Sequence, residues 1–286
     1  MNAATALKLG RVSNLPTVWS NVLAGMILAG GGTDDPALAL TLTLVLVAVS
    51  SLYVGGMFLN DAFDADWDRR NRPERPIPTG DATRLEVFIW GGAMLAAGPL
   101  LLSAIGMTTA AVACALAFAI LGYDIAHKRL AHASWIMGLC RALVYLTAGY
   151  ALAGRPTPDL LAGAATLMVY VAGLTYVART EHLATTARTG ALALLAVPLV
   201  FALTRVPDAP ASLVFLVIAL AWGVICLRRL RPGPMRNAPA AVGGLIAGIS
   251  LIDAVFLAAW QAPVAALAAV AAFAATRGLH RYVAGT

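Results

Sequence analysis

The chain has 286 residues, of which 60% are hydrophobic and only 12% are charged, and its mean hydropathy is +0.81. Soluble domains carry about twice that share of charged residues, so the composition excludes an ordinary water-soluble protein. It predicts an all-α membrane bundle. Basic residues that face anionic headgroups explain the net charge of +6, and we expect no nucleic-acid partner, because the basic residues form no patch with interleaved aromatic side chains.

Apolar stretches of near 20 residues recur along the chain, and each is long enough to cross a hydrocarbon core of about 30 Å. A tenth stretch, 262–276, is either a further crossing or a segment that lies in the interface or re-enters it. The connectors are short, so we expect one integral-membrane domain over 1–286, a polytopic transmembrane bundle of nine helices, or ten if the last stretch also crosses. The nine predicted spans cover 15–31, 38–59, 85–105, 107–123, 133–153, 159–178, 190–204, 210–228 and 240–258.

Basic residues gather on one side of these spans. Most of the 20 Lys and Arg residues lie before the first span or in the second, fourth, sixth and eighth connectors, whereas the opposite connectors hold only Arg155 and Arg205. The positive-inside rule therefore places the N-terminus and the even-numbered connectors in the cytoplasm. Arg277 and Arg281 favour a tenth crossing, because it would bring them to the same side.

The second span leads directly into Asn60-Asp61-Ala62-Phe63-Asp64-Ala65-Asp66-Trp67-Asp68. If the helix continues through this segment, Asp61, Asp64 and Asp68 share one face, since their spacings are 3, 4 and 7, and Asp66 points elsewhere. Three carboxylates on one face repel one another, and a divalent cation relieves the repulsion. All-oxygen ligands suit Mg²⁺, which commonly bridges protein carboxylates to substrate phosphates.

A basic segment, 69–80, follows the carboxylates and contains four arginines. Carboxylates can bind a metal ion, and the arginines that follow them can bind an anion. This order favours a site for a metal-chelated phosphate, where Asn60 adds an amide oxygen or orients a water. The alternative is a solvated acidic helix end in weak surface ion pairs. The spacing of the carboxylates and the basic loop behind them favour the phosphate site.

These residues carry a resemblance to a known family. Asn60 to Asp68, followed by Arg72-Pro73-Glu74-Arg75-Pro76-Ile77-Pro78-Thr79-Gly80, resembles the first aspartate-rich motif of the UbiA superfamily of intramembrane prenyltransferases. Tyr123-Asp124-Ile125-Ala126-His127-Lys128-Arg129 is similar to the family's tyrosine-to-lysine-arginine segment after the fourth helix. The resemblance covers most of the chain. It implies a helical bundle around a central cavity, in which Mg²⁺ held by the aspartates binds a prenyl diphosphate and an acceptor captures the allylic carbocation left by ionisation.

The resemblance assigns roles to the candidate site residues. The leaving diphosphate needs metal and cationic help, and the carbocation needs a dry, apolar cavity. We expect catalytic roles for Asp61, Asp64 and Lys128. The expected metal ligands are Asp61, Asp64 and Asp68, with Glu181 as a further candidate. The expected diphosphate contacts are Asn60, Arg72, Arg75, Tyr123, Lys128, Arg129 and Arg141.

Three polar residues within the predicted spans, Arg141, Asn21 and Asp253, are of particular interest. Arg141 is functional by default, and its expected partner is diphosphate, Asp124 or Asp61; the alternative is a residue that snorkels to the cytoplasmic interface. Asn21 faces the cavity or bonds to a neighbouring helix. Asp253 pairs with an arginine or lies near a helix end.

The family's second aspartate-rich motif is missing, because the equivalent region, 176–190, has Glu181 as its only carboxylate. Three explanations remain open. Arg179 and Arg188 replace the charge of a second metal cluster, or the donor or acceptor is unusual, or the chain has lost transfer and binds or moves a polyprenyl lipid. In this departure the chain resembles the divergent UbiA-like members of ebo-type gene clusters.

We therefore expect a Mg²⁺-dependent prenyltransferase of the cell inner membrane, with its active site on the cytoplasmic side. It would transfer a prenyl group from a prenyl diphosphate to an aromatic or lipid-like small-molecule acceptor. The alternative is a non-catalytic prenyl-lipid binding or transport protein on the same scaffold. An ion-coupled transporter fits less well, because the carboxylates cluster at one side and transporter sites lie near the midplane. The sequence indicates no oligomeric state.

Overall fold

The computed structural model describes residues 1–31, 36–128, 130, 132–179, 186–230, 236–283 and 285. These residues form helices and no strands, which confirms the all-α class for the described part of the chain. The helices are α1 (Ala3–Leu9), the 3₁₀ turn η1 (Val12–Asn14), α2 (Leu15–Leu28), α3 (Pro36–Asn71), α4 (Pro76–Thr79), α5 (Arg84–Ser103), α6 (Met107–Ala126), α7 (Ala133–Ala153), α8 (Pro158–Arg179), α9 (Thr186–Leu203), α10 (Ser212–Arg228), α11 (Ala238–Ala259) and α12 (Pro263–Leu279).

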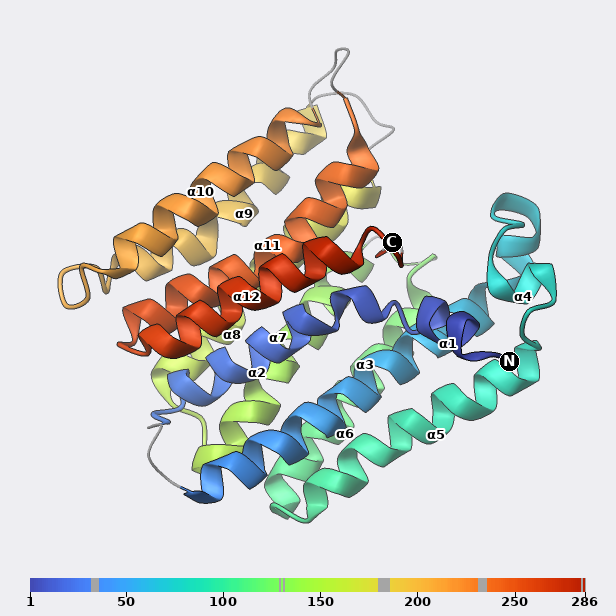
Figure 1. Ribbon diagram of the computed structural model, residues 1–286, viewed down its shortest axis with the longest axis horizontal. Helices are drawn as coiled ribbons and strands as arrows, with labels where there is room; N and C mark the ends of the chain where they lie inside the picture. Colours follow the sequence, from blue (N-terminus) through green and yellow to red (C-terminus); the bar gives the residue numbers. More distant parts are fainter. Residues whose placement is uncertain are drawn as a thin grey trace.

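The long helices lie side by side in one bundle, and the short helices α1 and α4 lie at one end of it (Figure 1). Helix α3 packs against α5 and α6, and α7 packs against α2, α6 and α8. Helix α11 contacts α2, α10 and α12, and α12 also contacts α2. Helices from the two ends of the chain are therefore neighbours. This closure brings side chains of α2, α7 and α11 together inside the bundle.

Each of the ten predicted apolar stretches is helical in the structure. Among the described residues, the helices long and apolar enough to cross a membrane are α3, α5, α6, α7, α8 and α11. The tenth stretch forms α12, which packs along α11 and α2, and His280 at its end lies 2.8 Å from the Asn14 side chain at the start of α2. The chain therefore returns to the end of the bundle where its first long helix begins, while the number of crossings stays a prediction.

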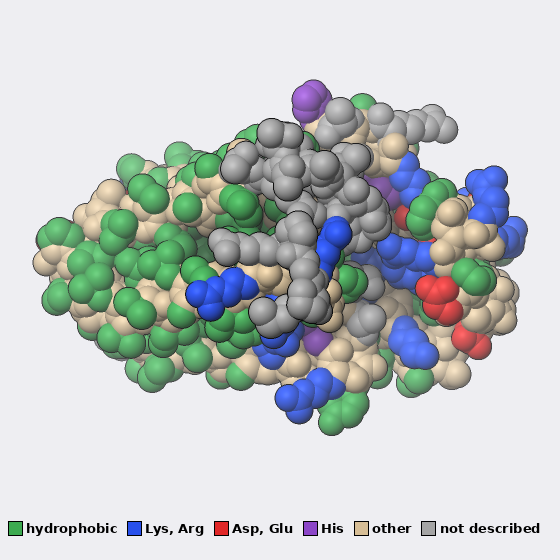
Figure 2. All heavy atoms as spheres, turned by 90° about the horizontal axis from the view of Figure 1, so that it is seen from above, with side chains coloured by type: hydrophobic (Ala, Val, Ile, Leu, Met, Phe, Trp, Pro, Cys, Tyr) green, Lys and Arg blue, Asp and Glu red, His purple; other side chains and the backbone are tan. Residues whose placement is uncertain are grey.

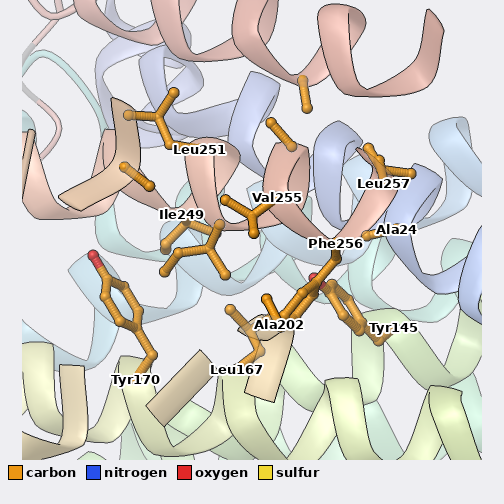
Figure 3. Packing of buried hydrophobic residues seen from close by; sticks show 14 of the residues in the cluster. Ala24, Tyr145, Leu167, Tyr170, Ala202, Ile249, Leu251, Val255, Phe256 and Leu257 are labelled. Carbon is orange, nitrogen blue, oxygen red and sulfur yellow. The ribbon is translucent and has the colours of Figure 1, made fainter. Parts of the chain in front are cut away.

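The interior is apolar and packed closely by small residues. Tyr145, Leu167, Val255 and Phe256 meet between α7, α8 and α11 (Figure 3). Helices α2 and α7 touch backbone to backbone at Gly25, where an added Cβ would lie 2.5 Å from the carbonyl oxygen of Tyr145. Glycine at such a contact lets two helices approach closely in lipid, and here it sets the register of α2 against α7.

Charged side chains concentrate at one end of the molecule, whereas hydrophobic side chains cover the other end (Figure 2). The charged end contains α4 and the last turns of α3 (Figure 1). A bundle with one polar end and an apolar flank matches the environment of a helix bundle embedded in lipid. The predicted carboxylate motif lies at this polar end.

Candidate functional site

Helix α3 continues without a break from the apolar span through the carboxylates to Asn71. Asp61 and Asp68 are 3% and 4% exposed, and Asp64 is half-buried. Asp66 instead lies at the surface, where it pairs with Arg69 at 3.5 Å and Arg84 at 3.0 Å. The predicted division, with three carboxylates on one inward face and Asp66 elsewhere, is therefore confirmed.

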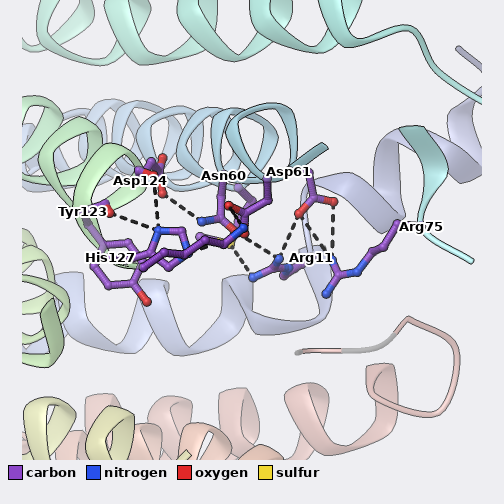
Figure 4. A network of polar contacts seen from close by, with 10 residues as sticks. Arg11, Asn60, Asp61, Arg75, Tyr123, Asp124 and His127 are labelled. Carbon is purple, nitrogen blue, oxygen red and sulfur yellow. Dashed lines mark hydrogen bonds and ion pairs between the residues drawn. The ribbon is translucent and has the colours of Figure 1, made fainter. Parts of the chain in front are cut away.

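Two arginines from outside the helix neutralise Asp61 (Figure 4). The Arg11 Nη2 donates to Asp61 Oδ1 at 2.9 Å and to Asn60 Oδ1 at 3.2 Å. The Arg75 Nη1 lies 3.3 Å and 3.4 Å from the two oxygens of Asp61. Arg75 is held in place because Pro76 begins α4 and forces the preceding residue into an extended conformation, with φ −71° and ψ 152°.

The two arginines also affect each other. Burial lowers the pKa of Arg11, but the charge of Asp61, the hydrogen bond to Asp61 and the nearby Tyr53 and Tyr123 together outweigh burial, so the net pKa is raised above its usual value. Burial and the neighbouring charge of Arg11 lower the pKa of Arg75. Arginine stays protonated at neutral pH in any case, so two cations share one buried carboxylate.

Asp64 is neutralised by the segment that follows α6. Lys128 Nζ lies 2.5 Å from Asp64 Oδ1, and His127 Nε2 lies 3.4 Å from Oδ2. The hydrogen bond with Asp64 raises the pKa of His127 above its usual value. The His127 Nδ1 faces the carbonyl oxygens of Tyr123 and Asp124, each at 3.2 Å, which fixes the ring at the end of α6. Lys128 also lies over the ring of Trp67, 4.7 Å from its centroid.

A further carboxylate, Asp124, extends the site inward. The Asn60 Nδ2 donates to Asp124 Oδ1 at 3.1 Å, which ties α3 to α6 (Figure 4). Asp124 is 4% exposed, and its Oδ2 is buried with no hydrogen-bond partner among the residues that the structure describes. A buried carboxylate oxygen without a partner is costly, so this atom marks a position that suits a cation or a proton.

A cavity lies directly beneath these polar groups, between α2, α3, α6 and α7. Its volume is about 80 Å³, and most of its wall is aliphatic. The polar side chains on its wall are Tyr53, Tyr123, Asp124 and Arg141. The site thus combines a charged mouth with an apolar interior.

Arg141 has a different protein partner from those expected. Its Nη1 donates to Asn21 Oδ1 at 2.8 Å, whereas no described carboxylate, including Asp61 and Asp124, forms an ion pair with it. Asn21 in turn donates to Asp253, so the expectation that Asp253 pairs with an arginine or lies near a helix end is also wrong. The prediction could not supply these partners because the register between α2, α7 and α11 is set by packing.

The remaining predicted residues divide into three groups. Tyr123 lines the cavity and stacks on His127, with ring centroids 5.1 Å apart. Arg72 is exposed, its guanidinium lies 5.8 Å from the centroid of the Trp67 ring, and it forms no ion pair with a described carboxylate. Arg129 and Glu181 lie outside the described residues, as do the side chains of Arg179 and Arg188.

Two residues of the site had no predicted role in it. Arg11 counted only as a basic flank of the first span, and His127 had no assigned function. The available signal was weak: Arg11 precedes the first span at the end where the motif lies, and His127 sits inside the segment similar to the family pattern.

The donor chemistry at this site fits Mg²⁺. Among the described residues, no three carboxylate, histidine or cysteine side chains converge closely enough to hold a metal by themselves. Mg²⁺ does not require that, because it usually binds one or two carboxylates together with waters and substrate phosphates. The all-oxygen set of Asp61, Asp64 and Asp68, with the unpartnered Asp124 Oδ2 nearby, provides that kind of ligand.

Fold and site together define a helical membrane protein with a carboxylate and cation cluster at the mouth of an apolar cavity. The chain belongs to the UbiA prenyltransferase family, whose model matches residues 18–283.

Comparisons with individual proteins agree with this family. Digeranylgeranylglyceryl phosphate synthase of Methanothrix thermoacetophila is 33% identical over 143 residues, which is 50% of this chain and 51% of that protein. The chain thus matches about half the length of that curated relative. A UbiA homologue from Archaeoglobus fulgidus bound to GPP and Mg²⁺ has a TM-score of 0.65 at 17% identity, covering 91% of this chain and 99% of the other. The structure reported for digeranylgeranylglyceryl phosphate synthase in membranes has a TM-score of 0.61 at 20% identity, covering 92% and 98%. At these identities the solved structures show a shared fold.

Proposed function

We propose that this chain is a Mg²⁺-dependent prenyltransferase that moves a prenyl group from a prenyl diphosphate to an aromatic or lipid-like small-molecule acceptor. One observation carries the proposal. Asp61 and Asp64 each lie against cations from separate parts of the chain, at the mouth of an apolar cavity. The named activity of the matched relative and the GPP and Mg²⁺ bound to the A. fulgidus homologue support the same chemistry.

In this proposal the cations change partners when the donor binds. Arg11, Arg75 and Lys128 now donate to motif carboxylates. A diphosphate at the same mouth offers these donors stronger, charge-assisted hydrogen bonds, and the freed carboxylate oxygens become available to Mg²⁺. Asn60 and Tyr123 lie beside this exchange. Arg72 and Arg129 remain candidate diphosphate contacts from the family resemblance alone.

Asp61, Asp64 and Asp68 would hold the metal, with Glu181 as a further candidate. When bound, Mg²⁺ neutralises negative charge that builds on the diphosphate as the allylic C–O bond breaks. The protein cations would contribute to the same end, since Arg11, Arg75 and Lys128 contact the carboxylates proposed to hold the metal. Lys128, Asp61 and Asp64 are therefore the residues on which turnover depends most.

The cavity supplies the second requirement of this reaction. Its wall is mainly aliphatic, with Tyr53 and Tyr123 as the aromatic members. An apolar wall excludes the water that would quench an allylic cation, and aromatic faces stabilise positive charge. The chain should lie in the cell inner membrane, with its N-terminus and the site on the cytoplasmic side, as the distribution of basic residues predicts.

The test uses the purified full chain in nanodiscs with Mg²⁺ and labelled prenyl diphosphates of several lengths. Release of diphosphate and formation of prenylated product are measured with aromatic and glyceryl lipid acceptors. Asp61→Asn and Asp64→Asn should lower kcat/KM at least about 100-fold, as expected when groups that stabilise transition-state charge are lost. Asp66→Asn is the matched control, because Asp66 lies on the same helix but is exposed.

Two results would count against the proposal. Equal activity of the Asp61, Asp64 and Asp66 variants would show that the buried carboxylates do not carry the reaction. Tight prenyl-diphosphate binding with no turnover for any acceptor would favour the alternative, a prenyl-lipid binding or transport protein on the same scaffold.

A further inference from the structure

Arg141 lies inside the bundle, on the wall of the cavity that Asp124 also lines, and it pairs with no motif carboxylate. It is the ninth residue of α7, about 12 Å along the helix from its first residue at 1.5 Å per residue. Its side chain lines the cavity. A charged group at such a depth is costly in a membrane protein and is retained where it has a partner or a ligand.

A relay of hydrogen bonds holds this guanidinium. Arg141 Nη1 donates to Asn21 Oδ1 at 2.8 Å, and Asn21 Nδ2 donates to Asp253 Oδ2, also at 2.8 Å. Asp253 is fully buried in α11, and Ser20 and Tyr145 donate to its two oxygens, each at 2.5 Å. Asp253 thereby fixes which end of the Asn21 amide faces Arg141.

The relay leaves most of the guanidinium unused. Arginine has five N–H donors, yet among the described residues Arg141 has one hydrogen-bond acceptor, the Asn21 oxygen, and no carboxylate within ion-pair distance. Its other close neighbour is the ring of Tyr53, whose centroid lies 5.8 Å from Arg141 Cζ. The geometry therefore offers a fork of donors to an oxyanion in the cavity.

This anion subsite is separate from the diphosphate mouth. Tyr53, which Arg141 contacts, precedes Asn60 by seven residues on α3, which is about 10 Å along the helix. A diphosphate held at Asp61 and Asp64 is compact and would not span both positions. The allylic cation would form between them, and a bare guanidinium nearby would destabilise it through charge repulsion. A second anion on Arg141 removes that repulsion.

We infer that Arg141 binds an oxyanion, carboxylate or phosphate, on the prenyl acceptor, and that Asn21 and Asp253 are positioning residues for it. This inference rests on the proposed function and narrows its acceptor to molecules that carry such a group. Arg141 selects and orients the acceptor but takes no part in the bonds that are made or broken.

The test measures binding separately from turnover. The purified full chain is placed in nanodiscs of zwitterionic lipid, with Mg²⁺ and a thiolodiphosphate donor analogue that does not ionise. Four acceptor probes form two matched pairs: 4-hydroxybenzoate with 4-hydroxybenzamide, and geranylgeranylglyceryl phosphate with geranylgeranylglycerol. Calorimetry gives Kd for each probe, and the two pairs distinguish a carboxylate from a phosphate ligand.

The charged member of one pair should bind tighter than its neutral counterpart. Arg141→Gln should raise Kd for that charged probe roughly 10- to 100-fold, the loss expected for hydrogen bonds to a charged group, and leave the neutral probe and the donor analogue within about twofold. Arg141→Lys keeps the charge but not the fork, so it should fall between. Asp253→Asn should give the same selective loss at roughly three- to tenfold, because the Asn21 amide is then free to turn away.

Tyr145→Phe is the control for the packed core around Asp253. It removes one donor to the carboxylate but leaves the Asn21 bond, so Kd should change less than about threefold. If Asp253→Asn does not fold, Arg141→Lys still reports on the subsite, and a thermal melt of each variant identifies that case.

Three outcomes overturn the inference. Wild-type protein that binds none of the charged probes better than its neutral partner has no oxyanion subsite. Loss of donor-analogue binding in Arg141→Gln, equal to the loss for the acceptor, would make Arg141 a diphosphate contact. A similar loss in Tyr145→Phe and Asp253→Asn would make the relay purely structural. If a charged probe binds in an Arg141-dependent way but no product forms in the transfer assay, the inferred subsite stands and only the proposed function is wrong.

Discussion

Arg11 provides the sharpest test of how the motif carboxylates are stabilised, because no role at the site was predicted for it from the sequence. Its Nη2 lies 2.9 Å from the oxygen of Asp61, which is 3% exposed. At an effective dielectric of about 20, opposite charges at 2.9 Å attract by about 6 kcal/mol before desolvation is counted. Arg11→Gln removes this attraction and leaves a buried carboxylate with Arg75 as its remaining cation.

The net loss should be smaller than the attraction itself. Removing the sole partner of a buried charge costs about 3–5 kcal/mol. Arg75 remains at 3.3 Å, and its repulsion from Arg11 disappears. We therefore expect Arg11→Gln to lower the free energy of unfolding by about 1–3 kcal/mol. Its affinity for a prenyl-diphosphate analogue should fall about 10- to 100-fold, since a charge-assisted hydrogen bond to phosphate is lost.

Arg69→Gln is the matched control, because Arg69 also pairs with an aspartate of the motif segment, at the same end of the molecule. Both Arg69 and its partner Asp66 are exposed, so this salt bridge should contribute less than about 1 kcal/mol. Unfolding in mixed detergent micelles measures stability, and calorimetry with the donor analogue measures affinity. Asp61→Asn in the Arg11→Gln background should recover part of the lost stability, as a double-mutant cycle would show. Equal effects of the Arg11 and Arg69 substitutions would refute the reasoning.

Three further predictions follow from other parts of the structure. Removal of Mg²⁺ with EDTA should leave the melting temperature of the free protein nearly unchanged, because Arg11, Arg75 and Lys128 neutralise the carboxylates. EDTA should, however, abolish the stabilisation that the donor analogue gives, which is about 2.7 kcal/mol when the analogue is present at 100 times its Kd. Gly25→Leu should destabilise by about 1–3 kcal/mol, since α2 and α7 must separate; Gly92→Leu, with open space around it, is the control in the same melt, and a loss no larger than its own would contradict the packing argument. Asp159→Asn removes the charge that pairs with Arg205 and leaves one acceptor oxygen for Arg205 and Trp260, far from the site. Stability should fall by about 1 kcal/mol or less, because the pair is partly exposed, and kcat/KM should not change.

Local patterns were sufficient to predict the helices and the inward face of the motif. The ten apolar stretches correspond to helices because in a membrane a backbone has to satisfy its own hydrogen bonds. The spacing of Asp61, Asp64 and Asp68 predicted one face because α3 is continuous there. Both inferences depend only on residues close together in the chain.

Partners from distant segments could not be predicted in the same way. Arg141 meets Asn21, not Asp61 or Asp124, because the contact at Gly25 sets how far α2 slides along α7. A shift of one helical turn, about 5.4 Å, would have brought a different residue opposite Arg141. Arg11 was missed for a similar reason, because its contact with Asp61 depends on how η1 turns the chain into α2.

The charges around the first aspartate-rich motif bear on how the site could bind a diphosphate without the second motif. The motif carboxylates Asp61, Asp64 and Asp68 face three cations, Arg11, Arg75 and Lys128, so these six side chains together bring little net charge. A diphosphate adds several negative charges, which this balance cannot absorb. Added Mg²⁺ supplies the missing positive charge, and the protonated form of His127, favoured by its contact with Asp64, contributes in the same direction. In the proposed function, a site built this way would need less metal charge than one made of carboxylates alone, and a single aspartate-rich motif would then be enough for a diphosphate.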